Sequence, residues 1–247
     1  MPKAVRQEEI LRFLQTRQCV SVQEICGAVF ASPATIRRDL RAMEEEKLVR
    51  LFHGGVMLAR QDRRDVPLAV REYENPKIKS AIAKKAAELL PPGASVMLDA
   101  SSTALYVANE LSPSQELTVF TNCLRTAVAL AEKNIRTYCL GGGINRLALS
   151  TGGSLAEENI RLVQVDYLLF SSQGLDWDGA ITDYSEDETK LRRLMLRHSK
   201  KRYFLCDSDK VGQRMLFNVC AADALDGVIS DADVSRIPGI RWIPAEG

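Results

Sequence analysis

Apolar residues recur at intervals of three and four through the first 43 positions, which predicts three short amphipathic helices. The second helix is expected over 22–30, opened by a capping box of Ser21 and Glu24. The third begins after Ser32, whose side chain can cap the first turn. Pro33 suits the next position, because proline lacks an N–H and none is needed there. The apolar positions are Ile10, Leu11, Phe13 and Leu14 in the first helix, Ile25, Val29 and Phe30 in the second, and Ile36, Leu40 and Met43 in the third.

The third helix has two unlike faces. Its apolar positions share one side, and roughly the opposite side carries Ala34, Arg37, Arg38 and Arg41. Only two residues separate it from the second helix, a tight turn typical of a helix-turn-helix, whose last helix enters the DNA major groove. Three amphipathic helices can also form a small structural bundle, so the arginines alone do not decide for DNA.

A hairpin pattern follows the third helix. Val49, Leu51 and Val56 alternate with polar or turn residues around Gly54 and Gly55, which permit the positive φ angles of a tight turn. Residues 1–57 are therefore predicted to form a winged helix-turn-helix domain, with the hairpin as its wing. The cap, the turn, the basic face and the hairpin together favour DNA binding over a structural bundle.

The pattern changes beyond this domain. A polar stretch of mixed charge over 58–75 predicts a linker. From residue 76 to residue 247, short apolar strands alternate with amphipathic helices, which predicts an α/β domain with a mostly parallel sheet. Strands are expected over 95–99, 118–121, 136–140, 166–171, 202–207 and 227–230, and helices over 77–90, 103–111, 124–133 and 186–199.

Polar and small residues follow these strands, at the edge where open α/β sheets bind ligands. A hydroxyl-rich loop before a helix, a glycine loop and a lysine suit a phosphate, while Asp99, Asn122 and Asp176 suit sugar hydroxyls. Each signal taken alone is more often a plain cap, an exposed turn or a flexible loop. The candidate effector residues are Asp99, Ser101, Ser102, Thr103, Asn122, Gly142, Gly143, Gly174, Asp176 and Lys210.

Ser32, the run from Thr35 to Leu40, Arg50 and the run from His53 to Gly55 resemble the signature of the DeoR family of bacterial transcriptional regulators. One departure is Lys47, where the family usually has glycine. The resemblance and the helical wheel imply that Pro33, Ala34 and Arg37 face base edges. They imply that Thr35, Arg38, Arg41, Arg50, His53 and Gly54 lie against the DNA backbone.

The resemblance extends to about Asp231 and implies that the second domain is a sugar-phosphate sensor related to ribose-phosphate isomerases. The matching positions are Lys79, Ile82, Ala83, Thr121, Asn122, Gly142, Gly143, Gly174, Asp176, Gly179, Glu186, Lys190, Asp207 and Lys210. The run from Asp99 to Thr103 departs from the commoner Asp-x-Gly-Thr-Thr. With the run from Val119 to Asn122, this variant is most similar to the L-fucose operon branch of the family, which implies a deoxyhexose or ketose phosphate as effector.

Charge and composition bear on three further questions: nucleic-acid binding, metal or cofactor sites, and the cellular compartment. The net charge is only +1 over 247 residues, but residues 1–60 hold 10 Lys and Arg against 7 Asp and Glu, which favours phosphate contacts there. The six cysteines include no C-x-x-C pair and there are only two histidines, so neither a zinc site nor a cofactor is expected. No signal peptide or membrane-spanning run is evident, so a cytoplasmic protein with reduced thiols is expected.

Two other functions stay open on the sequence. The related isomerases carry Asp-Gly-Ala-Asp where this chain has the run from Gln173 to Asp176, and an amide cannot be the base that isomerisation needs. A sugar-phosphate isomerase or transferase with an attached DNA-binding domain is thus disfavoured rather than excluded. The other is an architectural DNA-binding protein whose second domain only oligomerises. One recognition helix makes too few base contacts for operator selectivity, so a dimer or higher homo-oligomer is expected.

Overall fold

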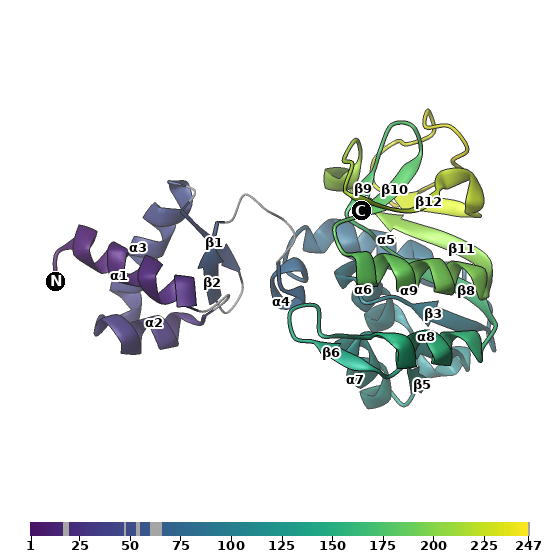
Figure 1. Ribbon diagram of the computed structural model, residues 1–247, viewed down its shortest axis with the longest axis horizontal. Coiled ribbons are helices and arrows are strands. Elements are labelled where there is room, and N and C mark those ends of the chain that lie inside the picture. The colour runs from purple at the N-terminus through teal and green to yellow at the C-terminus, as the bar shows by residue number, and fades with distance from the viewer. Residues whose placement is uncertain (17–19, 47, 53–54, 60–65, 247) are drawn as a thin grey trace. The chain divides into compact units, whose positions relative to one another are not determined.

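The computed structural model describes residues 1–16, 20–46, 48–52, 55–59 and 66–246. The chain divides into two compact units, Met1–Glu74 and Asn75–Gly247 (Figure 1). Each unit has its own hydrophobic core, so each is described separately.

Three helices pack around a small core in the first unit. They are α1 (Lys3–Thr16), α2 (Val22–Val29) and α3 (Pro33–Glu45). Both predicted caps are present: Ser21 and Glu24 form a capping box at α2, and Ser32 Oγ accepts a hydrogen bond from the Thr35 amide at α3. The core contains the predicted apolar positions Ile10, Leu14, Ile25, Val29, Ile36, Leu40 and Met43.

Phe30 departs from the helix predicted over 22–30. The helix ends at Val29, and Phe30 takes the left-handed conformation with φ 48° and ψ 48°. Its amide donates to the Cys26 carbonyl and so closes the last turn, an ending common in helices. The Phe30 side chain is 93 % exposed and adds nothing to the apolar face.

The wing is a two-stranded antiparallel ladder. β1 (Val49–Phe52) pairs with β2 (Gly55–Leu58), and Leu51 lies opposite Val56, which also forms a backbone bridge with Val20. Farther along, α4 (Leu68–Arg71) lies within the stretch predicted as a linker and has two buried side chains, Leu68 and Val70. That stretch therefore contains a short helix.

The second unit is built on a seven-stranded sheet with the order β14-β13-β11-β8-β3-β4-β5, and every pair in it is parallel. Its strands are β3 (Ser95–Leu98), β4 (Thr118–Thr121), β5 (Arg136–Cys139), β8 (Val165–Phe170), β11 (Ser199–Cys206), β13 (Gly227–Ser230) and β14 (Trp242–Pro244). The chain proceeds from β3 to β4 and β5, then places β8 on the other side of β3. The carboxyl ends of β3 and β8 therefore flank the switch point, where such sheets bind ligands.

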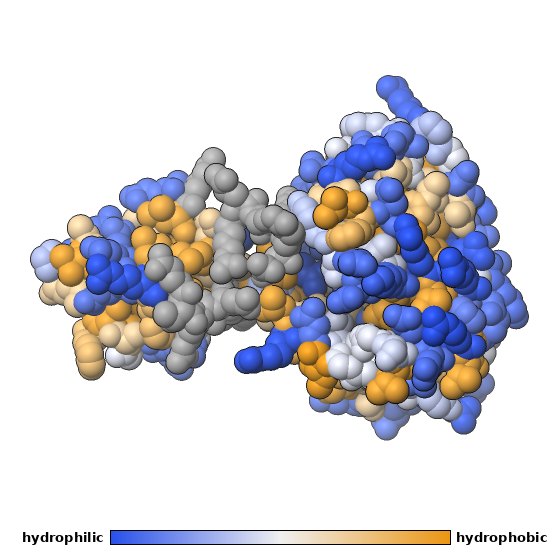
Figure 2. Space-filling view, in the orientation of Figure 1, coloured by the Kyte–Doolittle hydropathy of each residue, from blue (hydrophilic) through white to orange (hydrophobic). Residues whose placement is uncertain are grey.

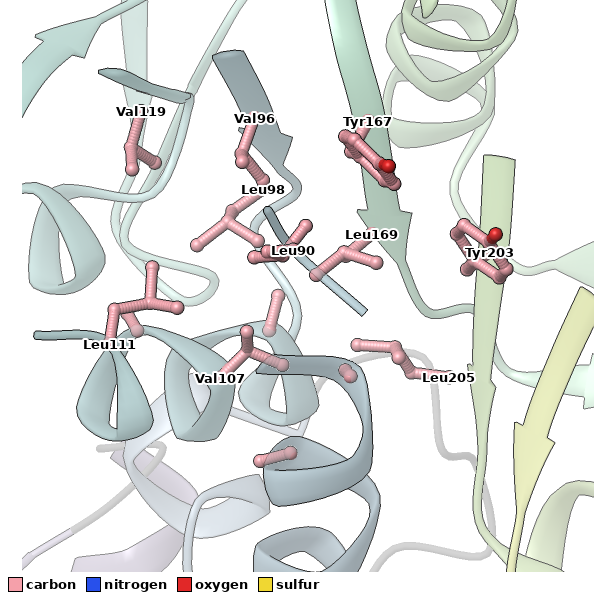
Figure 3. Packing of buried hydrophobic residues seen from close by; sticks show 14 of the residues in the cluster. Leu90, Val96, Leu98, Val107, Leu111, Val119, Tyr167, Leu169, Tyr203 and Leu205 are labelled. Carbon is pink, nitrogen blue, oxygen red and sulfur yellow. The ribbon is translucent and has the colours of Figure 1, made fainter. Parts of the chain in front are cut away.

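Helices cover both faces of this sheet. α5 (Pro76–Glu88), α6 (Ser102–Glu110) and α7 (Leu124–Glu132) contribute to one apolar cluster, and α8 (Ser154–Arg161) and α9 (Glu186–Arg197) to the other. Successive residues of β3 alternate between them: Val96 and Leu98 belong to the first cluster, shown in Figure 3, and Met97 to the second. The visible outer surface of the unit is largely hydrophilic, with scattered hydrophobic residues (Figure 2).

Several short elements are not predicted by the sequence pattern. β6 (Gly143–Asn145) and β7 (Ser150–Gly152) form a hairpin, and β9 (Gly174–Leu175), β10 (Ala180–Asp183) and β12 (Phe217–Ala221) form a separate sheet of order β12-β10-β9. Single 3₁₀ turns span Pro113–Gln115, Ser208–Lys210 and Ala222–Ala224. Within the described ranges, no helix has the length and apolar character needed to cross a membrane.

Candidate DNA interface and effector site

The helix α3 presents a basic face to solvent. Five of its exposed residues were predicted to contact DNA, namely Pro33, Ala34, Arg37, Arg38 and Arg41, while Glu44 and Glu45 are exposed at its C-terminal end. Thr35 is half-buried, and its hydroxyl oxygen lies 2.9 Å from Ser32 Oγ. One apolar face packs on the domain and one cationic face is left for the phosphates and base edges of a groove.

A partly buried ion pair joins α3 to α1. Asp39 is 2 % exposed, and its carboxylate accepts a hydrogen bond from Arg6 Nε at 2.5 Å. This hydrogen bond raises the pKa of the Arg6 guanidinium. No role was predicted for Asp39, although its position three residues after the buried Ile36 places it on the inner side of the helix.

Arg50 extends from β1 and is exposed. Its Nη1 lies 2.6 Å from Glu74 Oε1 in the same unit, so the guanidinium predicted to contact the DNA backbone is paired with a carboxylate here. His53 and Gly54, also predicted to contact DNA, lie outside the described residues.

Asp99, the residue after β3, connects the carboxyl ends of β3 and β8 by hydrogen bonds. It is 1 % exposed, and its Oδ1 accepts from Ser101 Oγ at 2.6 Å and from the amides of Ser101 and Ser171, both at 3.3 Å. Ser101 Oγ in turn accepts from the Ala104 amide and so caps α6. The N-terminus of α6 is thus fixed at the switch point of the sheet.

Lys210 belongs to the same group. Its Nζ donates to Ser171 Oγ at 2.7 Å and lies 3.0 Å from Asp207 Oδ2. Ser102 and Thr103 form the first turn of α6, where backbone amides have no partner within the helix. A lysine and a helix N-terminus at one sheet edge are features that favour an anion.

Arg192 of α9, which the sequence analysis missed, lies at the centre of this group. It is buried, and its Nε donates to Asp99 at 2.8 Å, its Nη1 donates to Asp183 at 2.9 Å, and Glu188 lies 3.7 Å away. Burial acts to lower the pKa of Arg192, but the carboxylates of Asp183, Asp99 and Glu188 outweigh it and raise that pKa. The available signal is an arginine at an inward position of the helix, four residues after Glu188.

Asn122 and Thr103 each bury a polar atom that no other described residue contacts by a hydrogen bond. Asn122 is fully buried after β4, and its Nδ2 donates to the Thr151 carbonyl at 3.2 Å. Within the described part of the chain, Asn122 Oδ1 and Thr103 Oγ1 have no hydrogen-bond partner. Since buried polar atoms nearly always have one, these two atoms are candidates for contact with a bound molecule.

The predicted glycines have packing roles. Gly142 has a φ of 103°, and a Cβ there would lie 2.3 Å from the Gly152 carbonyl oxygen. A Cβ on Gly174 would lie equally close, 2.3 Å, to the carbonyl oxygen of Gln213. Gly143 is exposed at the start of β6. Glycine is required at the first two positions by a close approach of backbone, whether or not a ligand is bound.

Two carboxylates predicted to be free for sugar hydroxyls are engaged instead. Asp99 is held by Arg192, and Asp176 accepts a hydrogen bond from Arg214 Nη1 at 2.9 Å. In the second case the arginine also bridges to Asp178, at 2.6 Å. An ion pair within the chain uses the same acceptor atoms as a sugar would, and the sequence pattern cannot distinguish the two.

A winged helix with a basic recognition helix, joined to a parallel-sheet domain whose ligand edge favours an anion, defines a class: ligand-responsive DNA-binding regulators. Family models agree with this assignment. Residues 6–62 match the DeoR-like helix-turn-helix domain, and residues 74–232 match the DeoR C terminal sensor domain. The chain belongs to the DeoR family of transcriptional regulators.

Relatives match over nearly the whole chain. The HTH-type transcriptional regulator GolR of Listeria innocua is 32% identical, over 94% of this chain and 91% of its own. The L-fucose operon activator of Haemophilus influenzae is 31% identical, over 92% of this chain and 91% of its own. The glycerol-3-phosphate regulon repressor of Escherichia coli is 28% identical, over 94% and 92%. Ribose 5-phosphate isomerase A from Methanocaldococcus jannaschii aligns at 14% identity with a TM-score of 0.43, over 56% of this chain and 55% of its own.

Proposed function

We propose that this protein is a sequence-specific transcriptional regulator of a sugar-utilisation operon, controlled by a phosphorylated sugar that binds in the second unit. One observation carries the proposal: the same chain has an exposed basic face on α3 in its first unit and, in its second unit, Lys210 and the α6 N-terminus at the switch point of the sheet. Relatives named for the L-fucose operon and the glycerol-3-phosphate regulon support it. A deoxyhexose or ketose phosphate is the proposed effector.

The predicted DNA-contacting residues are proposed to form two groups, one that contacts base edges within the major groove and one that contacts the DNA backbone. Pro33, Ala34 and Arg37 face base edges, because the first turns of a recognition helix enter the major groove. The remaining predicted residues, Thr35, Arg38, Arg41, Arg50, His53 and Gly54, contact the backbone. Arg50 exchanges its partner Glu74 for a phosphate when DNA binds.

The effector phosphate is proposed to lie between Lys210 and the first turn of α6, near Ser101, Ser102 and Thr103. A phosphate there competes with Asp207 for the Lys210 ammonium. Of the polar groups predicted to read sugar hydroxyls, Asn122 is the one whose acceptor oxygen is unused within the described residues. We therefore assign it a hydroxyl donor from the sugar, whereas Asp99 positions α6.

Catalysis is not part of the proposal. The relatives are transcriptional regulators, and Gln173 stands where an isomerase needs a carboxylate base. The regulator is proposed to act in the cytoplasm as a dimer or higher homo-oligomer, since selective operator binding requires more than one recognition helix. Light scattering of the intact chain gives the number of subunits.

Thermal unfolding of the intact protein tests the sensor. The ligands are a panel of pentose and hexose phosphates, the matching free sugars and inorganic phosphate. A ligand at about 100 times its dissociation constant adds roughly 2.7 kcal/mol to the free energy of unfolding, which gives a measurable rise in Tm. We expect one phosphorylated sugar to raise Tm in the wild type and to have no effect on Lys210→Ala.

The matched control is Lys84→Ala, which removes an exposed lysine of α5 and should keep the full shift. An equal shift in wild type and Lys210→Ala would refute the proposed role of Lys210. A panel without any shift would refute the phosphorylated effector and leave the DNA-binding proposal to its own test.

A further inference from the structure

The β6–β7 hairpin lies against the segment that follows β4. The Thr151 amide donates to the Asn122 carbonyl at 2.7 Å, and the Leu124 amide donates to the Leu149 carbonyl at 2.8 Å. These two bonds flank an antiparallel bridge between Cys123 and Ser150. The hairpin, residues 143–152, therefore covers the carboxyl end of β4.

Two buried side chains lie beneath this cover. Asn122 and Cys123 are both fully buried, and Asn122 Oδ1 lacks a partner within the described residues. The hairpin is bonded to this side chain, since Asn122 Nδ2 donates to the Thr151 carbonyl at 3.2 Å. Because Oδ1 is buried as well, a ligand hydroxyl can satisfy it only after the structure around it opens, and the hairpin is the segment whose movement we consider.

The other side of the hairpin is tied to α9. Ser150 Oγ donates to Glu188 Oε1 at 2.7 Å. Glu188 lies 3.7 Å from Arg192, which holds Asp99 at the end of β3. One hydroxyl therefore connects the hairpin to the charged group at the switch point.

Glycines stand at both bases of the hairpin. Gly141 and Gly142 precede β6 with φ of 69° and 103°, Gly152 ends β7, and Gly153 follows it with φ of 83°. Ile144, the middle residue of β6, pairs with Thr151 and is 62 % exposed. Segments that move as a unit turn about a few residues able to change φ and ψ, and such glycines meet that need.

We propose that the hairpin 143–152 is a gate over the effector site and that Ser150 and Glu188 latch it shut. Opening the latch exposes Asn122 and Cys123 and admits the ligand. The opening is a property of the free protein; only the nature of the ligand rests on the proposed function.

Labelling of native Cys123 with a thiol reagent measures the opening without any effector. Burial raises the pKa of the Cys123 thiol, so the closed form is unreactive. Fully buried Cys206 reports global unfolding in the same sample, with both sites resolved by peptide mass spectrometry. Ser150→Ala removes a hydrogen bond to a charged acceptor and should speed Cys123 labelling about tenfold, with Cys206 unchanged.

Ser154→Ala is the matched control, since it removes an exposed hydroxyl four residues away and should leave both labelling rates alone. The gate is refuted if Cys123 and Cys206 react at one rate in the wild type. The latch is refuted if Ser150→Ala labels like the wild type.

A covalent lock completes the test. The bridge pair Cys123 and Ser150 is of the non-hydrogen-bonded kind, whose Cα atoms lie close enough for a disulfide, so Ser150→Cys should close the gate on oxidation. The oxidised variant should lose the Tm shift given by the phosphorylated sugar, and a reductant should restore it. An unchanged shift after oxidation refutes the gate. Failure of the wild type to respond to any sugar phosphate refutes the proposed function, while the labelling result still decides the opening.

Discussion

Arg37 and Arg38 are consecutive in the chain, and both are exposed on α3. Successive residues of a helix point about 100° apart, so the two guanidinium groups face different parts of a bound duplex. Arg37 is proposed to contact a base edge, and Arg38 is proposed to contact a phosphate. Two neighbouring arginines of equal charge and exposure thus differ in what they contribute to binding.

Replacing each of these arginines by alanine separates the roles. Arg37→Ala is expected to cost about 1 to 3 kcal/mol at one base position and to relax selectivity there. Arg38→Ala should weaken operator and random DNA alike and reduce the salt dependence of binding. Fluorescence anisotropy on operator and random duplexes at several salt concentrations measures both. Equal losses of Arg37→Ala on the two duplexes would contradict base reading.

Single residues were predictable where their role is local. Ser21 and Ser32 were predicted as caps and cap α2 and α3, whereas Ser101, predicted to contact the effector, caps α6. Arg192 was not predicted, because its partner Asp99 lies 93 residues away in the chain. The same separation along the chain hides the ion pair from the side of Asp99, which the sequence therefore predicted to contact a ligand.

Elements were predictable where a period extends over several turns or a strand is fully buried. The strand over 118–121 has the predicted bounds, and the helices near 77–90 and 124–133 differ by one or two residues at their ends. The β6–β7 hairpin and the β12-β10-β9 sheet were missed, because most of their short strands contain glycine or polar residues and show no clear apolar run or alternation. These short elements carry much of the site, so the site was predicted less completely than the fold.

A side chain at the amino end of β8 joins it to β3. Asp166 accepts hydrogen bonds from Lys200 Nζ at 2.8 Å, from Ser95 Oγ at 2.6 Å and from the Ser95 amide at 3.0 Å. These bonds, that from Lys200 first, hold the pKa of Asp166 well below its ordinary value. A depressed carboxyl pKa stabilises the fold above the unfolded value of about 3.9, and this contribution is lost as pH falls through the folded pKa.

Asp166→Asn should therefore lower Tm at neutral pH. Its difference from the wild type should narrow as pH falls below about 4, because the unfolded wild-type carboxylate then takes up a proton that the folded carboxylate resists until a lower pH. Thermal unfolding of both proteins at a series of pH values gives the comparison. A Tm difference that stays constant down to the most acid samples would contradict the assignment.

At the scale of the whole molecule, effector and operator are linked by a thermodynamic cycle. If the phosphorylated sugar changes operator affinity by some factor, the operator must change sugar affinity by the same factor, typically about 5 to 150-fold. Titration calorimetry of the intact protein with each ligand, alone and with the other saturating, measures both factors. Unequal factors would show that a further equilibrium, such as a change of subunit number, accompanies binding.

Arg192 is shared among Asp99, Asp183 and Glu188, which belong to separate segments of the chain. Removing one partner strands a charge in the interior, whereas replacing a whole buried ionic group by apolar residues is often tolerated. We therefore expect these four positions to vary together among the relatives of this chain: either all four charged residues are kept, or all four are replaced. After the loss of a single one, restoring the original residue should be a more frequent outcome than a compensating substitution at another position.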